Sequence, residues 1–190
     1  MEKTKIGFAM CGSFCTFQPA LEQLHLLAEQ GHLLLPIMSK NASETDTRFG
    51  RASDFIWELE DTCRHKVIKT IPDAEPIGPK RMVDLMIVAP CTGNTLAKLA
   101  CGITDTPVTM AVKSSLRIGL PVVLALATND ALAASAQNIG RLLNVKNVYF
   151  VPLRQDDPEK KPSSLVCDFS KLIPTCEAAL AGKQLQPVFQ

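Results

Sequence analysis

Short apolar runs alternate along the chain with segments whose apolar residues recur every three or four positions. Runs that stay apolar at successive positions predict strands buried on both faces, whereas the longer period predicts amphipathic helices. The predicted strands are Lys5–Cys11, Leu33–Met38, Val67–Ile71, Asp84–Pro90, Pro121–Ala127 and Val148–Val151, of which Val67–Ile71 has the weakest pattern.

The helical patterns fall between these runs, and polar or proline-containing segments are expected to be loops. Gly31 is placed to end the first helix in a left-handed cap, and Ser53 and Thr92 are placed to begin two later helices. The expected inward residues are Phe17, Leu21, Leu24 and Ala28; Ile56, Leu59 and Cys63; Leu96, Leu99 and Ile103; Leu132, Ala136, Ile139 and Leu143; and Phe169, Leu172, Ile173, Cys176 and Leu180. The expected loops are Lys40–Ala52, Pro72–Lys80 and Arg154–Ser164.

Alternation of strands and helices through the whole chain predicts an α/β fold with a doubly wound parallel sheet. We therefore expect a three-layer sandwich of the flavodoxin or Rossmann-like kind, with helices on both faces of the sheet. One domain should span residues 1–190, with residues 152–190 forming a C-terminal loop and helix extension.

Composition and charge exclude several classes of protein. The 20 basic and 19 acidic side chains give a net charge of +1, which argues against a nucleic-acid binder. The longest apolar runs, such as Leu120–Thr128, are too short to cross a membrane, and no signal sequence is evident. Seven cysteines without a C-x-x-C pair predict no metal site and indicate a reduced, cytoplasmic protein with mostly buried thiols.

Small polar residues follow three of the predicted strands. Gly12-Ser13 follows the first, Ser39 the second, and Thr92-Gly93-Asn94-Thr95 the fourth. Ligands of an open parallel sheet bind at the carboxyl ends of its strands, where helix N termini favour anions. The residues predict one cleft that binds a phosphate, although each could by itself be a simple cap or turn. Neither G-x-G-x-x-G nor G-x-x-x-x-G-K-[ST] occurs, which disfavours a standard dinucleotide site or P-loop.

The segment APCTGNTLAKLACGITDTPVT, residues 89–109, resembles the signature of the flavoprotein family of homo-oligomeric flavin-containing cysteine decarboxylases. This resemblance covers about residues 4–150 and implies FMN as the cofactor, bound near the contact between protomers of a trimer or a multiple of trimers. The cofactor-binding residues expected from it are Gly12, Ser13, Phe14, Ser39, Pro90, Thr92, Gly93, Asn94, Thr95 and Asn129.

The chain departs from the decarboxylases at two motifs. Pro76 stands near the position of their catalytic histidine, and of their P-A-M-N-x-x-M-W motif only the asparagine, Asn129, is present. Cysteine decarboxylation is therefore disfavoured, and no catalytic residue can be named.

The segments AEPIGPKRMVDLMIVAPCTGNTLAKLA and VPLRQDDPEKKPSSLVCDF resemble a narrower family, the small B subunits of dipicolinate synthase. This resemblance spans essentially the whole chain. It implies that the dehydrogenase-like A subunit of that enzyme is the partner and supplies NAD(P), and that the two oxidise dihydrodipicolinate to dipicolinate in the mother cell of a sporulating bacterium. Two alternatives stay open: a stand-alone FMN-dependent decarboxylase or prenyltransferase, and a non-catalytic cofactor-binding or scaffolding subunit whose partner holds the whole active site.

Several other polar residues have both a functional and a structural interpretation. Four cations, Lys80, Arg81, Lys113 and Arg117, could face a dianionic substrate or be solvated surface charges. Cys91 could be a redox nucleophile or, as we favour, a packing residue. The segment Gln155–Lys161 could be a solvated loop or could contact a neighbouring protomer or partner chain, and His25 and His32 are expected at the surface.

Overall fold

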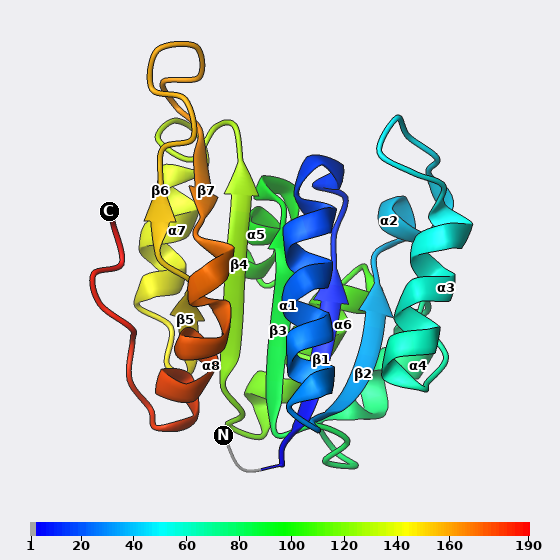
Figure 1. Cartoon of the computed structure of the whole chain (residues 1–190). Helices are drawn as coiled ribbons and strands as arrows, with labels where there is room; N and C mark the ends of the chain where they lie inside the picture. Colours follow the sequence, from blue (N-terminus) through cyan, green and yellow to red (C-terminus); the bar gives the residue numbers. More distant parts are fainter. Residues whose placement is uncertain (1–2) are drawn as a thin grey trace.

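The computed structural model describes residues 3–190 and contains a seven-stranded, mostly parallel sheet with helices on both faces (Figure 1). The strands are β1 (Lys5–Met10), β2 (Leu33–Met38), β3 (Leu85–Cys91), β4 (Val122–Thr128), β5 (Val148–Phe150), β6 (Leu153–Arg154) and β7 (Leu165–Cys167). The predicted α/β fold is confirmed. No helix of the described residues is long and apolar enough to span a membrane.

The strand order β2-β1-β3-β4 is fully parallel, and β5 adds to β4 in the same direction. The chain leaves β1 toward one edge of the sheet and returns at β3 to build the other half. The neighbouring ends of β1 and β3 therefore form the point where the winding direction changes, which is where ligands bind in such sheets.

Helices cover both faces of the sheet. The helices are α1 (Phe17–Glu29), α2 (Lys40–Glu44), α3 (Ala52–Cys63), α4 (Ile71–Ala74), α5 (Gly93–Ala100), α6 (Pro107–Arg117), α7 (Ala136–Leu143) and α8 (Leu172–Leu180), with 3-10 turns η1 (Phe14–Thr16), η2 (Glu75–Ile77) and η3 (Phe169–Lys171). In the view of Figure 1, α1 and α8 lie in front of the sheet, and α5, α6 and α7 lie behind it.

Four expectations about the first half of the chain need correction. Val67–Ile71 is not a strand, because only Ile68 bridges to β2 before Thr70 caps α4. The expected loop at Lys40–Ala52 contains α2, which Ser39 caps. The next helix begins at Ala52 and not at Ser53, since the Asp46 carboxylate accepts from the Ala52 N–H at 2.8 Å. The segment Pro72–Lys80 contains helical turns, which proline tolerates in a first turn.

The second half differs from expectation in four elements. Helix α6 was missed because its buried face is mostly small or polar, although Thr106 and Thr109 form a capping box at its start. Helix α7 buries Ile139 and Leu142, whereas Leu132 and Leu143 are exposed. The short strands β6 and β7 were also missed, and β7 pairs antiparallel with the last residues of β4.

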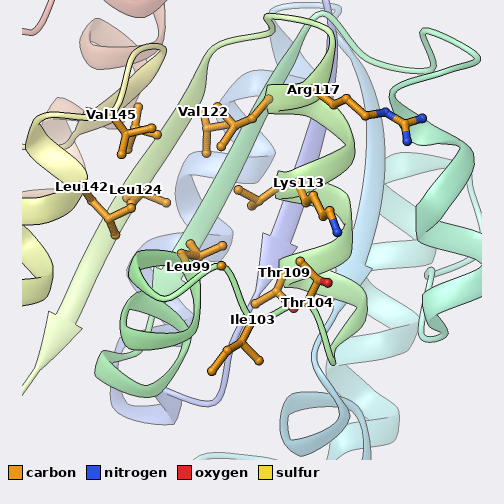
Figure 2. A pocket seen from close by; sticks show the side chains of 14 residues that line it. Leu99, Ile103, Thr104, Thr109, Lys113, Arg117, Val122, Leu124, Leu142 and Val145 are labelled. Atoms are coloured by element: carbon orange, nitrogen blue, oxygen red, sulfur yellow. The ribbon is translucent and has the colours of Figure 1, made fainter.

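An apolar valley lies between α6 and α7, beyond the end of the short helix α5 (Figure 2). Its volume is about 410 Å³, and Val122 and Leu124 of β4 form its floor. Helix α5 ends at Ala100, so this part of the sheet has no helix over it. At its border, Ile103 is 46% exposed and Val145 is 40% exposed.

Candidate functional site

Three loops begin side by side at the carboxyl ends of β1, β2 and β3. The Cys11 N–H donates to the Pro90 carbonyl at 3.1 Å, which ties the end of β1 to β3. The Ser39 N–H donates to the Met10 carbonyl at 2.9 Å, which ties β2 to β1. The residues that follow these strands are therefore held at one edge of the sheet.

The loop after β1 is held in place by short local hydrogen bonds. The Ser13 N–H donates to the Cys11 carbonyl at 2.8 Å, and the Thr16 hydroxyl donates to the Ser13 carbonyl at 2.8 Å. The ring of Phe14 packs against Phe17, with centroids 5.2 Å apart. These contacts present Gly12 and Ser13 to the open edge of the sheet.

Helix α5 begins directly at this edge, and Thr92 caps it as expected. The Thr95 N–H donates to the Thr92 hydroxyl oxygen at 3.2 Å, while the Thr95 hydroxyl donates to the Cys11 sulfur at 3.2 Å. The N–H groups of Gly93 and Asn94 lie in the first turn, where no intrahelical acceptor exists. The helix start thus offers backbone donors and a partial positive charge at the point where β1 and β3 end.

Three adjoining hollows surround the start of α5. The central cleft, of about 530 Å³, is lined by Gly12, Ser13, Phe14, Cys15, Thr16, Arg48, Phe49, Thr92, Gly93, Asn94, Ala127, Thr128, Asn129, Asp156, Lys161, Ser164, Leu165 and Val166. The lysine hollow, of about 490 Å³, is lined by Cys11, Gly12, Ser39, Lys40, Asn41, Thr92, Asn94, Thr95, Lys98, Asp105 and Thr106. The amide hollow, of about 540 Å³, is lined by Gly93, Asn94, Ala97, Thr128, Asn129, Asp130, Ala134, Ser135, Gln137 and Asn138.

The structure brings nine of the ten expected cofactor residues to these hollows. Seven line the central cleft: Gly12, Ser13, Phe14, Thr92, Gly93, Asn94 and Asn129. Ser39 and Thr95 line the lysine hollow instead, which shares Gly12, Thr92 and Asn94 with the central cleft. Pro90 lines none of the three, because it is buried in β3.

The C-terminal segment contributes charges to the central cleft. Lys161 lies 2.9 Å from the carboxylate of Asp156, and this carboxylate raises the pKa of Lys161 above its usual value. Arg48 reaches the cleft from the loop before α3, with its guanidinium 4.9 Å from the ring centroid of Phe49. Arg48 and Phe49 were missed by sequence reasoning, because they lie in a segment expected to be only a polar loop.

A polar cluster behind the start of α5 was also missed. The hydroxyls of Thr128 and Ser135 donate to the same oxygen of Asp130, Oδ1, at 2.6 and 2.9 Å. These bonds, the one from Thr128 above all, lower the pKa of Asp130, so it is ionised at neutral pH. A Cβ on Gly93 would stand 2.5 Å from the Thr128 hydroxyl, so glycine is what allows α5 to approach this cluster.

The cations expected to face a substrate lie elsewhere. Lys80 and Arg81 precede β3, at the opposite end of the sheet from the cleft. Lys113 and Arg117 line the apolar valley, and Arg117 extends away from its floor in Figure 2. Their interpretation as surface charges agrees with these positions, and Arg48 and Lys161 are the basic residues that line the central cleft.

Two further expectations are decided by burial. Cys91 is fully buried in β3, and burial raises the pKa of its thiol well above the usual value, which favours a packing role. His25 is partly exposed and lies 3.3 Å from Glu58, but His32 is buried, so its expected surface position is wrong. The reason is that Leu33 begins β2, which draws its neighbour His32 against the backbone N–H of Thr4.

Known proteins resemble the chain over most of its length. The model of the flavoprotein family matches residues 1–179. A curated relative, the B subunit of dipicolinate synthase from Bacillus subtilis (strain 168), is 43% identical over 184 residues, covering 97% of this chain and 92% of that protein.

Two solved structures show how far the likeness extends. The dipicolinate synthase B subunit from Bacillus halodurans C superposes with a TM-score of 0.90 at 42% identity, covering 98% of this chain and 96% of the other. A dodecameric FMN-dependent Ubix-like decarboxylase from Escherichia coli O157:H7 gives a TM-score of 0.65 at 25% identity, covering 78% and 79%.

Proposed function

The chain belongs to the flavoprotein family, and from this membership we propose that its central cleft and lysine hollow together bind FMN. The observation that carries the proposal is the convergence of Gly12, Ser13, Thr92 and Asn94 where β1 and β3 end. Neutral hydroxyls, backbone N–H groups and a helix start suit a phosphate. The solved relative described as FMN-dependent supports the choice of FMN.

The residues present fit both ends of such a cofactor. The phosphate would lie where the lysine hollow meets the central cleft, beside Lys40 and held by Ser13, Ser39, Thr92 and Thr95. The central cleft also has apolar lining residues, Phe14, Phe49, Leu165 and Val166, and it would hold the planar ring. When bound, the flavin would supply a two-electron acceptor, which no side chain provides.

We propose further that the chain is the small subunit of a dipicolinate synthase. The likeness to the Bacillus subtilis protein over 97% of this chain supports this assignment. The reaction would oxidise dihydrodipicolinate to dipicolinate in the cytoplasm of a sporulating mother cell. Arg48 and Lys161 line the cleft and would pair with the two carboxylates of the substrate.

A separate, dehydrogenase-like A subunit is part of this proposal. Reduced flavin must pass its electrons on before a second turnover, and the 190 residues contain no nicotinamide fingerprint. A dehydrogenase-like partner that binds NAD(P) would provide this outlet. We therefore expect little dipicolinate from this chain alone and full turnover once the partner is added.

Reconstitution tests the proposed function. The chain and the dehydrogenase-like partner are purified separately and assayed for dipicolinate with dihydrodipicolinate and NADP. Flavin absorbance of the purified chain is recorded in parallel. Multiple turnovers by this chain alone would overturn the need for a partner, whereas full turnover by the partner alone would favour a non-catalytic, cofactor-binding role for this chain.

A decarboxylase function has less support. Pro76, near the position where the decarboxylases carry their histidine, lies in η2, which Ser114 of α6 anchors through the Glu75 carbonyl. Pro76 lines none of the three hollows, so no histidine base is supplied there.

We propose that the chain assembles into a homo-oligomer, a trimer or a multiple of it. A solved relative is described as dodecameric, and exposed apolar side chains surround the valley of this chain. Light scattering at micromolar concentration tests the assembly, and a strictly monomeric mass would contradict it.

A further inference from the structure

The amide hollow adjoins the proposed flavin site but is not needed to hold FMN. It lies between the first turns of α5 and α7, beside the carboxyl end of β4. Its lining is unusual for its side-chain amides, which come from Asn94, Asn129, Gln137 and Asn138. An amide both donates and accepts hydrogen bonds, so such a hollow can recognise a group that does the same.

Asn138 is the residue that points most directly to a ligand. It is only 8% exposed, and it lines the hollow. Its backbone N–H donates to the Ser135 carbonyl, but no group among residues 3–190 forms a hydrogen bond with its side-chain amide. Among residues 3–190, the buried side-chain atoms that lack a hydrogen-bond partner do not include this amide, so the amide is open to the hollow and free to bind a group that enters it.

Asp130 sets the charge that the hollow accepts. Both hydroxyl donors use its Oδ1, so neither Thr128 nor Ser135 neutralises the second oxygen, Oδ2. No Lys or Arg side chain lines the hollow. A carboxylate without a counter-ion in the wall repels anions and attracts a positively charged group. The occupant is therefore neutral or cationic.

We propose that the amide hollow binds a carboxamide on a neutral or cationic ring, as in the oxidised nicotinamide ring. Asn138 would bind the carboxamide, and Asp130 would attract the ring cation. Gly93, Asn94, Thr128 and Asn129 line both this hollow and the central cleft, so a ring bound here lies next to the proposed flavin site. The assignment to nicotinamide rests on the proposed function, whereas recognition of a carboxamide does not.

The test uses the full chain without flavin or substrate and three small probes. 1-Methylnicotinamide carries the carboxamide and the positive charge, nicotinamide carries only the carboxamide, and 1-methylnicotinate replaces the carboxamide with a carboxylate. Titrations are followed by two-dimensional NMR, which also detects side-chain amide signals. We expect 1-methylnicotinamide to bind best and to shift the signals of Asn94 and Asn138. Equal binding of 1-methylnicotinate would overturn the proposal.

Two variants separate the amide contribution from that of the charge. Asn138→Ala should weaken both carboxamide probes about fivefold or more, because a hydrogen-bonding partner is lost. Asp130→Asn keeps an oxygen for Thr128 and Ser135 but removes the charge, so it should weaken 1-methylnicotinamide and leave nicotinamide unchanged. Asn144→Ala, on the far end of α7, is the matched control and should change neither.

The NMR shifts of the native chain and the binding of the variants decide the inference together. If Asn138→Ala does not fold, the amide shifts in the native chain still decide whether the probe lies in the hollow. Shifts confined to another surface, or unchanged binding in both variants, would overturn the inference. A neutral peptide amide serves as a further probe. If it shifts the signals of the hollow while 1-methylnicotinamide and nicotinamide do not, the inference is overturned in favour of a protein partner. Failure here leaves FMN binding and reconstituted turnover intact, and those are measured separately.

Discussion

The central cleft and the apolar valley lie on the same sheet but differ in the polarity of the residues that line them. The cleft stands at the carboxyl ends of β1 and β3, where hydroxyls, amides and a helix start meet. The valley lies farther down β4 and is lined mostly by aliphatic side chains, with Thr104, Thr109, Lys113 and Arg117 as its polar members (Figure 2). The cleft combines hydroxyls, side-chain amides and the N–H groups of a helix start, which together suit a phosphate, whereas the floor of the valley is aliphatic.

The two regions should respond differently to mutation. In the cleft, substitutions should change ligand binding with little effect on folding. In the valley, substitutions at buried positions should change stability with little effect on binding. Four experiments test or sharpen this contrast.

The largest effect is expected from Ser13→Asp in the cleft. A carboxylate beside the cofactor phosphate costs several kcal/mol, so FMN affinity should fall about 1000-fold or more. Ser13→Ala is the matched control and should lose only about tenfold, since it removes one hydrogen bond without adding charge. Fluorescence titration of FMN measures both. Unchanged affinity of Ser13→Asp would remove Ser13 from the site.

Leu124→Ala tests the valley. Leu124 is fully buried in β4 and lies on the valley floor. Its truncation should lower the free energy of unfolding by about 2–5 kcal/mol, measured by urea denaturation. FMN affinity should stay within about twofold of the native value. A large loss of affinity in the folded variant would mean that the two regions are coupled.

Alanine substitutions at Gly93 and Gly140 compare how a side chain changes stability at the start of α5 and on the outer surface of α7. Gly93→Ala should destabilise the chain by about 1–3 kcal/mol, because its Cβ would stand 2.5 Å from the Thr128 hydroxyl. Gly140→Ala meets no atom within 4 Å and lies inside a helix, so it should stabilise by up to about 1 kcal/mol. Thermal unfolding of both variants gives the sign of each change, and a stable Gly93→Ala would contradict the close approach.

The smallest effect concerns the end of the sheet opposite the cleft. Burial lowers the pKa of His32, whose Nε2 has no hydrogen-bond partner among the described residues. The unfolded chain therefore binds a proton more readily than the folded chain. The contribution of His32 to stability should be constant above about pH 7 and fall below the unfolded pKa of about 6.5, by about 1.4 kcal/mol per unit of pKa difference.

Urea denaturation at pH 7.5 and pH 5.5 checks this prediction. His32→Phe should show a smaller difference between the two pH values than the native chain does. An identical difference would assign the acid sensitivity to other groups. FMN affinity of this variant at pH 7.5 should be unchanged, because His32 lines none of the three hollows of the site.

The sequence by itself determined the fold class and most of the cofactor residues. Runs that are apolar on both faces leave few alternatives to a covered parallel sheet, which explains why β2 was predicted with its observed bounds. Turn and cap chemistry is also local, so Gly31, with a φ of +82°, and the cap at Thr92 could be predicted from neighbouring residues.

Only the tertiary structure decided which residues far apart in the sequence line the same cavity. Ser13, Arg48 and Lys161 line the same cleft, although Ser13 and Lys161 are more than 100 residues apart in the sequence. No periodic pattern of residues predicts this arrangement. The Asp130 cluster joins Thr128 at the end of β4 to Ser135 before α7, and the absence of a side chain at Gly93 lets α5 pack beside it. Helix α6 was missed for a related reason: its small and polar residues are buried by packing, which hydropathy along the chain does not reveal.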